Sequence, residues 1–354
     1  TGEHQIEAHH AVSFKIGLKD QNMDVLANLH SQIGNINSPL YGKALTKAQI
    51  RDLVTLPEED IQKVEAYLTK ETGKFCDVVT RRSALHDYIY VDTCAAQAQE
   101  IFPNLDLAVY RKEGTNHLIL RNSVLVDIAH NAYLLGFPHE LHQFISGIHD
   151  VTDIPVHYTH ISEKVDPSQP WSSDTEELTV KNMIDLFKVN YDGIDSSSFS
   201  ADDGQVRQGV VEFNYVSFSA SELASFQQRF GLPSNPIKKV IGSEEEEGQS
   251  VEASLDVQTI TGISAHVQTW DFVFGPTASF NDVIETIMST SGAPKVYSCS
   301  WGGTDEQYTE SSAESVNQDF LKMGLNGMTF LIASGDSGPT LNGENCDSFN
   351  PQYP

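Results

Sequence analysis

The sequence of 354 residues lacks the motifs that most directly assign a function. It has no run of 18 apolar residues, so it predicts no membrane-spanning helix. A Gly-x-Gly-x-x-Gly turn for a dinucleotide, a phosphate-binding P-loop and a His-Glu-x-x-His zinc motif are all missing. The four cysteines are too few for a disulfide scaffold and are not spaced as a zinc site. Any chemistry must therefore rest on other side chains.

Basic residues are also scarce. The chain has 22 Lys and Arg against 49 Asp and Glu, which gives a formal net charge of −27. A surface this acidic repels phosphate groups, so we expect neither nucleic acid nor an anionic membrane as a partner. With 39% hydrophobic residues the composition is still that of a globular protein, and the length fits two domains.

Histidine is nearly missing from the second part of the chain. Of 13 histidines, 12 precede residue 161 and only His266 follows it. Residues 1–160 carry 13 basic and 20 acidic residues, a net charge of −7, and protonating the 12 histidines would bring it to +5. Because histidine titrates between about pH 7 and 5, one hypothesis is that acidification loosens this part from the rest. The alternative is that the histidines are exposed and have no role.

The residue pattern divides the chain into three segments. Residues 1–150 mix expected strands with helices, two of which are expected to begin at Thr46 and Pro57, and this indicates a small α+β domain. Residues 151–175 are polar and rich in proline, which is typical of a linker that a protease can reach. In residues 176–354, apolar strand runs, the first of them at 210–215, alternate with helices, which predicts a parallel α/β sheet. The active sites of such sheets lie at the carboxyl ends of the strands.

Two acids in the third segment are spaced for joint chemistry. His266 lies in an expected strand, 266–273, so carboxylates would have to perform any acid–base catalysis. Glu252 and Asp256 stand four residues apart on an expected helix, 251–260, and therefore share one face. Their small or apolar neighbours favour partial burial, and a buried pair of carboxyls tends to share a proton. The alternative is an exposed acidic helix face.

Two expected strands end in glycine-containing turns. The strand before Ser334-Gly335 leads into Asp336, in the sequence Ala-Ser-Gly-Asp-Ser-Gly. Glycine lets the backbone approach a ligand closely, so Asp336 is a candidate site residue, or else it forms an Asx turn. The strand 295–300 ends in Ser300-Trp301-Gly302, which is either a core strand with a turn or an edge that pairs with an extended peptide.

Cys76 and Cys94 flank an expected strand in the first segment. They could form a disulfide, which requires an oxidising compartment, or remain two reduced and buried thiols.

Together these motifs resemble the sedolisins, the family of serine-carboxyl peptidases, and in particular their tripeptidyl-peptidase type. Glu252-Ala-Ser-Leu-Asp-Val-Gln is similar to the family's Glu/Asp helix, and Ala333-Ser-Gly-Asp-Ser-Gly to its oxyanion motif. Tyr297-Ser-Cys-Ser-Trp-Gly is similar to its substrate strand, and residues 38–46 to its propeptide signature. The resemblance implies a subtilisin-like parallel sheet with flanking helices, preceded by an α+β ferredoxin-like propeptide domain.

The resemblance also implies roles for individual residues. Glu252 would be the general base and Asp256 its orienting partner, while a protonated Asp336 would stabilise the oxyanion. The implied substrate-binding residues are Ser300, Trp301, Gly302, Ser334 and Gly335. Cys76 and Cys94 would form the propeptide disulfide. Because only a protonated carboxyl can donate a hydrogen bond, we expect an acidic pH optimum.

One family feature does not occur in this sequence. The family nucleophile lies in a Ser-Gly-Thr-Ser motif downstream of the oxyanion acid, and no such motif is present. We therefore expect the chain to be the first portion of a lysosomal, vacuolar or secreted proenzyme. The nucleophile and the calcium ligands that the resemblance implies would then follow residue 354, either on a separate cleaved chain or on a further part of the same chain.

Three other interpretations remain open. They are an acid endopeptidase of the same family, a pseudoprotease that only binds, and an ordinary subtilisin. The last is disfavoured because Glu252 stands where a subtilisin has histidine.

Overall fold

The chain folds into two units, neither of which is a single stretch of sequence. The computed structural model describes residues 3–70, 72–111, 118–122, 135–149, 179–189, 206–242, 250–304, 310–335 and 352–353. The first unit comprises Thr1–Pro155, Ser279–Ser291 and Tyr308–Gly327, and the second comprises Val156–Ala278, Gly292–Gln307 and Met328–Pro354. The predicted linker, 151–175, lies outside the described residues.

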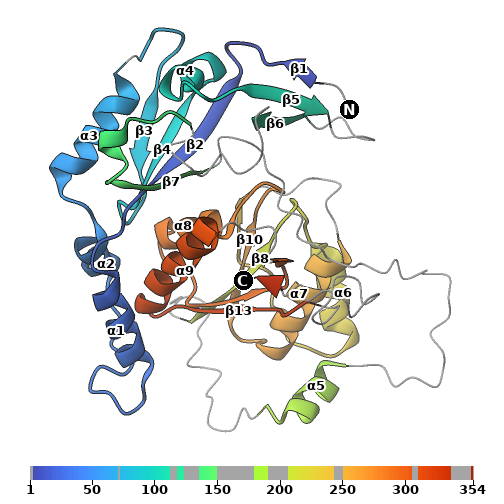
Figure 1. Ribbon diagram of the computed structural model, residues 1–354. Helices are drawn as coiled ribbons and strands as arrows, with labels where there is room; N and C mark the ends of the chain where they lie inside the picture. Colours follow the sequence, from blue (N-terminus) through green and yellow to red (C-terminus); the bar gives the residue numbers. More distant parts are fainter. Residues whose placement is uncertain are drawn as a thin grey trace, which may run out of the picture. The chain divides into compact units, whose positions relative to one another are not determined.

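The first unit contains a four-stranded antiparallel sheet in the order β3-β4-β2-β7 (Figure 1). Its strands are β2 (Ala11–Leu18), β3 (Val79–Arg82), β4 (Tyr88–Cys94) and β7 (Ile145–His149). A three-stranded sheet, in the order β1-β5-β6, is formed by β1 (Glu3–Gln5), β5 (Leu107–Arg111) and β6 (Leu118–Asn122). Mixed strands and helices agree with the α+β pattern read from the sequence.

Two helices of this segment begin at clear signals in the sequence. The helices of the segment are α1 (Met23–Gly34), α2 (Lys47–Val54), α3 (Glu58–Thr69) and α4 (Ala95–Ile101), and His139–Leu141 forms a 3-10 turn. Thr46 and Gln49 form a capping box at the start of α2. Helix α3 follows Pro57 with three acids in its first turn, where the helix dipole favours negative charge. Its Ile61, Val64 and Leu68 are buried in the same core as Phe14 and Ile16 of β2.

A disulfide joins Cys76 to Cys94, the last residue of β4. Of the two alternatives that the sequence left open, the structure therefore has the disulfide, whose persistence requires an oxidising compartment. Cys299 is buried and free, and Cys346 lies outside the described residues.

Two helices from later in the chain belong to the first unit. They are α8 (Phe280–Ser289) and α9 (Glu310–Leu325), which lie side by side in Figure 1. The rings of Phe280 and Phe320 hold them together with centroids 6.0 Å apart. The backbone N–H of Leu45 donates to the carbonyl of Leu325 at 2.8 Å, so the end of α9 is bonded to the segment before α2.

The second unit contains the parallel sheet that the alternating pattern predicts. Its strand order is β13-β11-β8-β10-β9, and each neighbouring pair is parallel. The strands are β8 (Arg207–Glu212), β9 (Lys239–Gly242), β10 (Gln268–Val273), β11 (Val296–Cys299) and β13 (Thr329–Ile332). A short antiparallel pair joins β12 (Gly303–Thr304) to β14 (Gln352–Tyr353). The carboxyl ends of the five parallel strands share one edge.

The helices of the second unit are α5 (Val180–Phe187), α6 (Ala220–Arg229) and α7 (Val251–Ile263). Helices α6 and α7 lie side by side along the sheet (Figure 1). No helix in the described ranges combines the length and apolar character needed to cross a membrane.

Two expectations about this unit were wrong in detail. The strand read at 210–215 runs from Arg207 to Glu212, because Asn214 and Tyr215 adopt left-handed conformations with φ of 58° and 55°. The strand read at 266–273 begins at Gln268. His266 is instead exposed in the turn that precedes the strand.

Candidate functional site

Helix α7 carries the two acids that the sequence singled out, Glu252 and Asp256. Ser250 caps the helix by accepting a hydrogen bond from the backbone N–H of Ala253 at 3.0 Å. Glu252 is 9% exposed, whereas its neighbours Val251 and Leu255 are 71% and 55% exposed. Glu252 is therefore turned towards the protein, not into bulk water.

Asp256 contacts the residue that follows strand β11. The hydroxyl of Ser300 donates to Oδ1 of Asp256 at 2.9 Å. The expected Glu/Asp helix and the expected substrate strand are thus brought together at the carboxyl edge of the sheet. Gly302, two residues further on, is half-buried.

Glu212 is a site residue that sequence reasoning missed. It is the last residue of the central strand β8 and is fully buried. The indole N–H of Trp301 donates to its Oε2 at 2.9 Å. Trp301, one of the expected substrate-binding residues, is 5% exposed.

Burial and the neighbouring acids shift the pKa of Glu212. Burial raises the pKa of Glu212 well above its usual range, and the charges of Asp256, Asp271 and Glu252 raise it further, while the Trp301 N–H acts in the opposite direction. Asp271 lies within β10 and is also fully buried. We call Glu212, Glu252, Asp256 and Asp271 the carboxyl cluster. The raised pKa of Glu212 means that this cluster holds a proton where ordinary carboxyls are ionised.

A signal in the sequence could have found Glu212 and Asp271. Each is a carboxylate inside an otherwise apolar strand, in Gly-Val-Val-Glu-Phe and in Thr-Trp-Asp-Phe-Val. Burying an acid is costly unless a partner compensates, so such a residue indicates a polar network.

Replacing Glu212 with glutamine is expected to stabilise the protein more at pH 7.5 than at pH 4.5. An unfolded Glu212 ionises near its ordinary pKa of 4.5, while the folded one stays protonated. The stability of the wild-type protein therefore falls as pH rises above this value, by at most about 1.4 kcal/mol per pH unit. Glutamine keeps an oxygen for Trp301 but cannot ionise. Melting temperatures at both pH values test this, and an equal difference at both would contradict it.

The remaining predicted site residues follow strand β13. Ser334 and Gly335 are exposed, and Gly335 has φ of +83°, as a sharp turn requires. The backbone N–H of Ala333 donates to the carbonyl of Cys299 at 3.0 Å, which places the ends of β13 and β11 next to each other. Asp336 lies outside the described residues.

Within the described ranges, no group of three or more His, Cys, Asp or Glu side chains is arranged to hold a metal ion. The expected calcium ion thus has no candidate ligand set among these residues.

Comparisons with known proteins found similar sequences and a similar structure. Residues 1–154 match the family model of the pro-kumamolisin activation domain. Tripeptidyl-peptidase 1 of Mus musculus is 23% identical over 367 residues, covering 99% of this chain and 60% of that protein. Tripeptidyl-peptidase 1 of Macaca fascicularis is 24% identical over 353 residues, covering 97% of this chain and 59% of that protein.

A solved structure is also similar over part of the chain. It is a Pseudomonas sedolisin (serine-carboxyl proteinase) complexed with pseudo-iodotyrostatin, with a TM-score of 0.36 and 20% identity, covering 44% of this chain and 48% of that chain.

The chain spans about 60% of the length of the curated relatives it matches. The activation-domain match and the tripeptidyl-peptidase 1 relatives, which align along nearly the whole chain, together support a proenzyme of the sedolisin type.

Proposed function

We propose that the chain belongs to the precursor of an acid-acting serine-carboxyl peptidase that releases tripeptides from the amino termini of peptides. The observation that carries the proposal is the buried carboxyl cluster at the carboxyl edge of a parallel sheet, where Asp256 accepts from Ser300 and Glu252 is turned inwards. The relatives named tripeptidyl-peptidase 1 support the exopeptidase form of the reaction.

In the proposed mechanism, Glu252 takes the proton of a serine nucleophile as that serine attacks the peptide carbonyl. Glu252 then returns the proton to the leaving amine, and water repeats the sequence on the acyl-enzyme. Asp256 orients Glu252, and a protonated Asp336 donates to the developing oxyanion. The nucleophile is proposed to stand in a Ser-Gly-Thr-Ser motif, which this sequence does not contain, on a segment that follows residue 354.

The proposed mechanism leads to an acidic optimum. Asp336 can donate a hydrogen bond only while it is protonated, and an ordinary aspartate is protonated only at low pH. At Glu212, burial raises the pKa and the charges of Asp256, Asp271 and Glu252 raise it further, which supports a site that works with protonated carboxyls. The substrate would lie along Ser300–Gly302 and Ser334–Gly335, the residues at the ends of β11 and β13.

The other parts of the proposal concern organisation and location. We propose an inhibitory propeptide at residues 1–150, an activation linker at 151–175, and the first part of the catalytic domain at 176–354. A ferredoxin-like topology of the propeptide is supported by the strand order β3-β4-β2-β7, with helices between β2 and β3 and between β4 and β7. The disulfide supports a lysosomal, vacuolar or secreted location. Calcium binding remains a prediction of the resemblance, without ligands among the described residues.

Product analysis tests the proposed reaction. The full-length protein, matured at pH 3.0, is incubated with a peptide that has a free amino terminus and with its acetylated form. We expect tripeptides from the free form and no cleavage of the acetylated form. Internal cleavage of both forms would identify an endopeptidase instead. No cleavage of either would favour the non-catalytic alternative and reject the peptidase proposal.

A further inference from the structure

A buried lysine in the first unit is surrounded by three aspartates. Nζ of Lys322, on α9, lies 2.7 Å from Asp20, 2.6 Å from Asp87 and 2.9 Å from Asp319. All four side chains are at most 5% exposed. Asp20 and Asp87 belong to the activation domain, whereas Asp319 lies on α9 itself. We call these four residues the Lys322 cluster.

Further polar contacts connect the activation domain to α8 and α9 around this cluster. The hydroxyl of Tyr88 donates to Asp319 at 3.0 Å and the amide of Asn281 donates to the same oxygen at 2.6 Å. A second ion pair joins Lys15 of β2 to Asp282 of α8 at 2.5 Å, and Lys15 is 2% exposed. The activation domain and the helix pair α8 and α9 therefore each supply a cation and an anion to the other.

The three aspartates around Lys322 are not equivalent. Asp87 has additional donors, because the Ser83 hydroxyl donates to its Oδ1 at 2.6 Å. Oδ1 of Asp20 is buried and has no hydrogen-bond partner in the described part of the chain. One lysine cannot neutralise three carboxylates, so at neutral pH the cluster keeps an excess of negative charge. Asp20, the least supported of the three, is the natural site for a proton.

We propose that the Lys322 cluster is an acid-strengthened latch that holds the activation domain on α8 and α9 in mild acid and opens only when the aspartates that remain ionised take up protons. The latch deepens the proposed zymogen function by setting the pH at which the inhibitory domain is released. Its physical basis lies in the contacts above and does not depend on peptidase activity.

The directions in which the pKa values of the aspartates are shifted support both the tightening in mild acid and the opening at lower pH. Burial raises the pKa of Asp20 to about 7, despite the charge of Lys322. Burial would also raise the pKa of Asp87, but the charge of Lys322 and the hydrogen bonds from Lys322 and Ser83 outweigh it and keep that pKa below its usual range. At Asp282, burial would raise the pKa, but the charge of Lys15 and its hydrogen bond outweigh burial and lower the pKa.

The sign of the pH dependence follows from these directions. A released, solvated Asp20 ionises near its ordinary pKa of 3.8, whereas the docked one takes up a proton near pH 7. Docking therefore strengthens as the pH falls from about 7 towards 4. The ionised Asp87 and Asp282 contribute docking free energy that is lost only when the pH falls below their ordinary pKa of 3.8.

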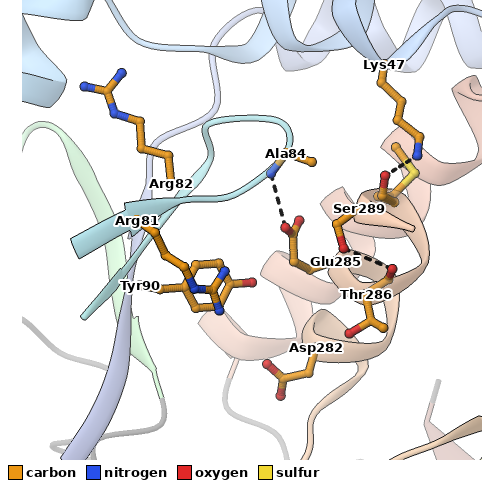
Figure 2. Close-up of a pocket in the computed structure, with 10 residues that line it drawn as sticks. Lys47, Arg81, Arg82, Ala84, Tyr90, Asp282, Glu285, Thr286 and Ser289 are labelled. Carbon is orange, nitrogen blue, oxygen red and sulfur yellow. Dashed lines mark hydrogen bonds between the residues drawn. The ribbon is translucent and has the colours of Figure 1, made fainter. Parts of the chain in front are cut away.

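A cavity beside the latch gives water access to a further acid (Figure 2). It measures about 560 Å³ and is lined by residues of α2, β3, β4 and α8, including Asp282 and Glu285. Oε1 of Glu285 accepts the backbone N–H of Ala84 at 3.1 Å. Burial and the charge of Asp87 raise the pKa of Glu285 to about 7, so Glu285 acts in the same direction as Asp20.

Two titratable groups adjoin the latch without belonging to it. Tyr88 stays neutral because burial raises its pKa. Of the histidine side chains that the structure describes, His149 is the buried one, 7% exposed, with its ring 5.8 Å from that of Tyr88. A proton on His149 would oppose the nearby charge of Lys15, its neighbour in the β2–β7 register. The histidine hypothesis therefore predicts loosening near pH 6, where the latch predicts tightening.

Amide hydrogen exchange of the full-length protein distinguishes the two. A Glu252→Gln background prevents self-processing, so the result is independent of peptidase activity. Exchange of α9 is measured at pH 7.5, 5.5 and 3.0 and corrected for the intrinsic pH dependence. From pH 7.5 to pH 5.5, we expect the frequency of α9 opening to fall by about tenfold or more. At pH 3.0 we expect α9 to open frequently, while β2 and β4 stay protected.

Two variants complete the experiment. Asp20→Asn should reduce the change between pH 7.5 and 5.5 clearly, because asparagine resembles a protonated aspartate, and Glu285 should account for what is left. Asp52→Asn, at an exposed residue of α2, should behave as wild type. Loosening already at pH 5.5, an unchanged Asp20→Asn response, or simultaneous exposure of β2, β4 and α9 would each overturn the latch.

Discussion

Glu252→Gln is expected to reduce the peptidase activity of the full-length protein by about a thousandfold or more. Glutamine has nearly the shape of glutamate and can fill the same buried position, but it cannot accept the proton of the nucleophile. The loss should appear in kcat and leave KM nearly unchanged, because the proton is transferred only in the reaction step.

The same helix offers a matched control. Leu255 is 55% exposed and lies between the two acids in sequence, so Leu255→Gln should retain wild-type activity and stability. Equal activity of Glu252→Gln and wild type would remove Glu252 from the proposed mechanism. Melting temperatures of both variants separate a catalytic defect from a folding defect.

Lys322→Met is expected to destabilise the first unit by about 3–5 kcal/mol at pH 7.5. Methionine leaves Asp20, Asp87 and Asp319 buried around an apolar side chain, without the cation that all three contact. The loss should shrink at pH 5, because carboxyls deprived of their cation take up protons more readily. Denaturant unfolding at both pH values measures the two losses.

Lys63→Met provides the comparison for a surface ion pair. Lys63 lies 2.6 Å from Asp60 and is 55% exposed, so its pair is screened by water and its loss should change stability little. Equal effects of Lys322→Met and Lys63→Met would contradict the account of the Lys322 cluster. If Lys322→Met fails to fold, Asp87→Asn/Lys322→Met should recover part of the folded protein, because it removes the carboxylate that holds its charge most firmly.

The sequence predicted elements best where the signal is local. Thr46 and Gln49 form their capping box, and the acids after Pro57 open α3. Apolar runs separated by helices predicted the parallel sheet. The end of β8 was misplaced because Phe213, Asn214 and Tyr215 continue an apolar pattern, although the backbone turns there by left-handed conformations that the pattern does not encode.

The sequence could not predict contacts between distant segments. Lys322 and Asp87 are 235 residues apart, and neither has an unusual local neighbourhood in the sequence. Helices α8 and α9 read as ordinary crossover helices, yet they pack in the first unit. For the candidate site, the i,i+4 spacing predicted Glu252 and Asp256. The acids that join them, Glu212 and Asp271, come from two other strands and meet only through the sheet register.

A double-mutant cycle on Glu252 and Asp256 tests the carboxyl pair most directly. The activities of wild type, Glu252→Gln, Asp256→Asn and the double variant are compared in the full-length protein at its optimum pH. If Asp256 acts through Glu252, the double variant should be no less active than Glu252→Gln alone. Independent losses that multiply in the double variant, or full activity of either single variant, would contradict this account of the site.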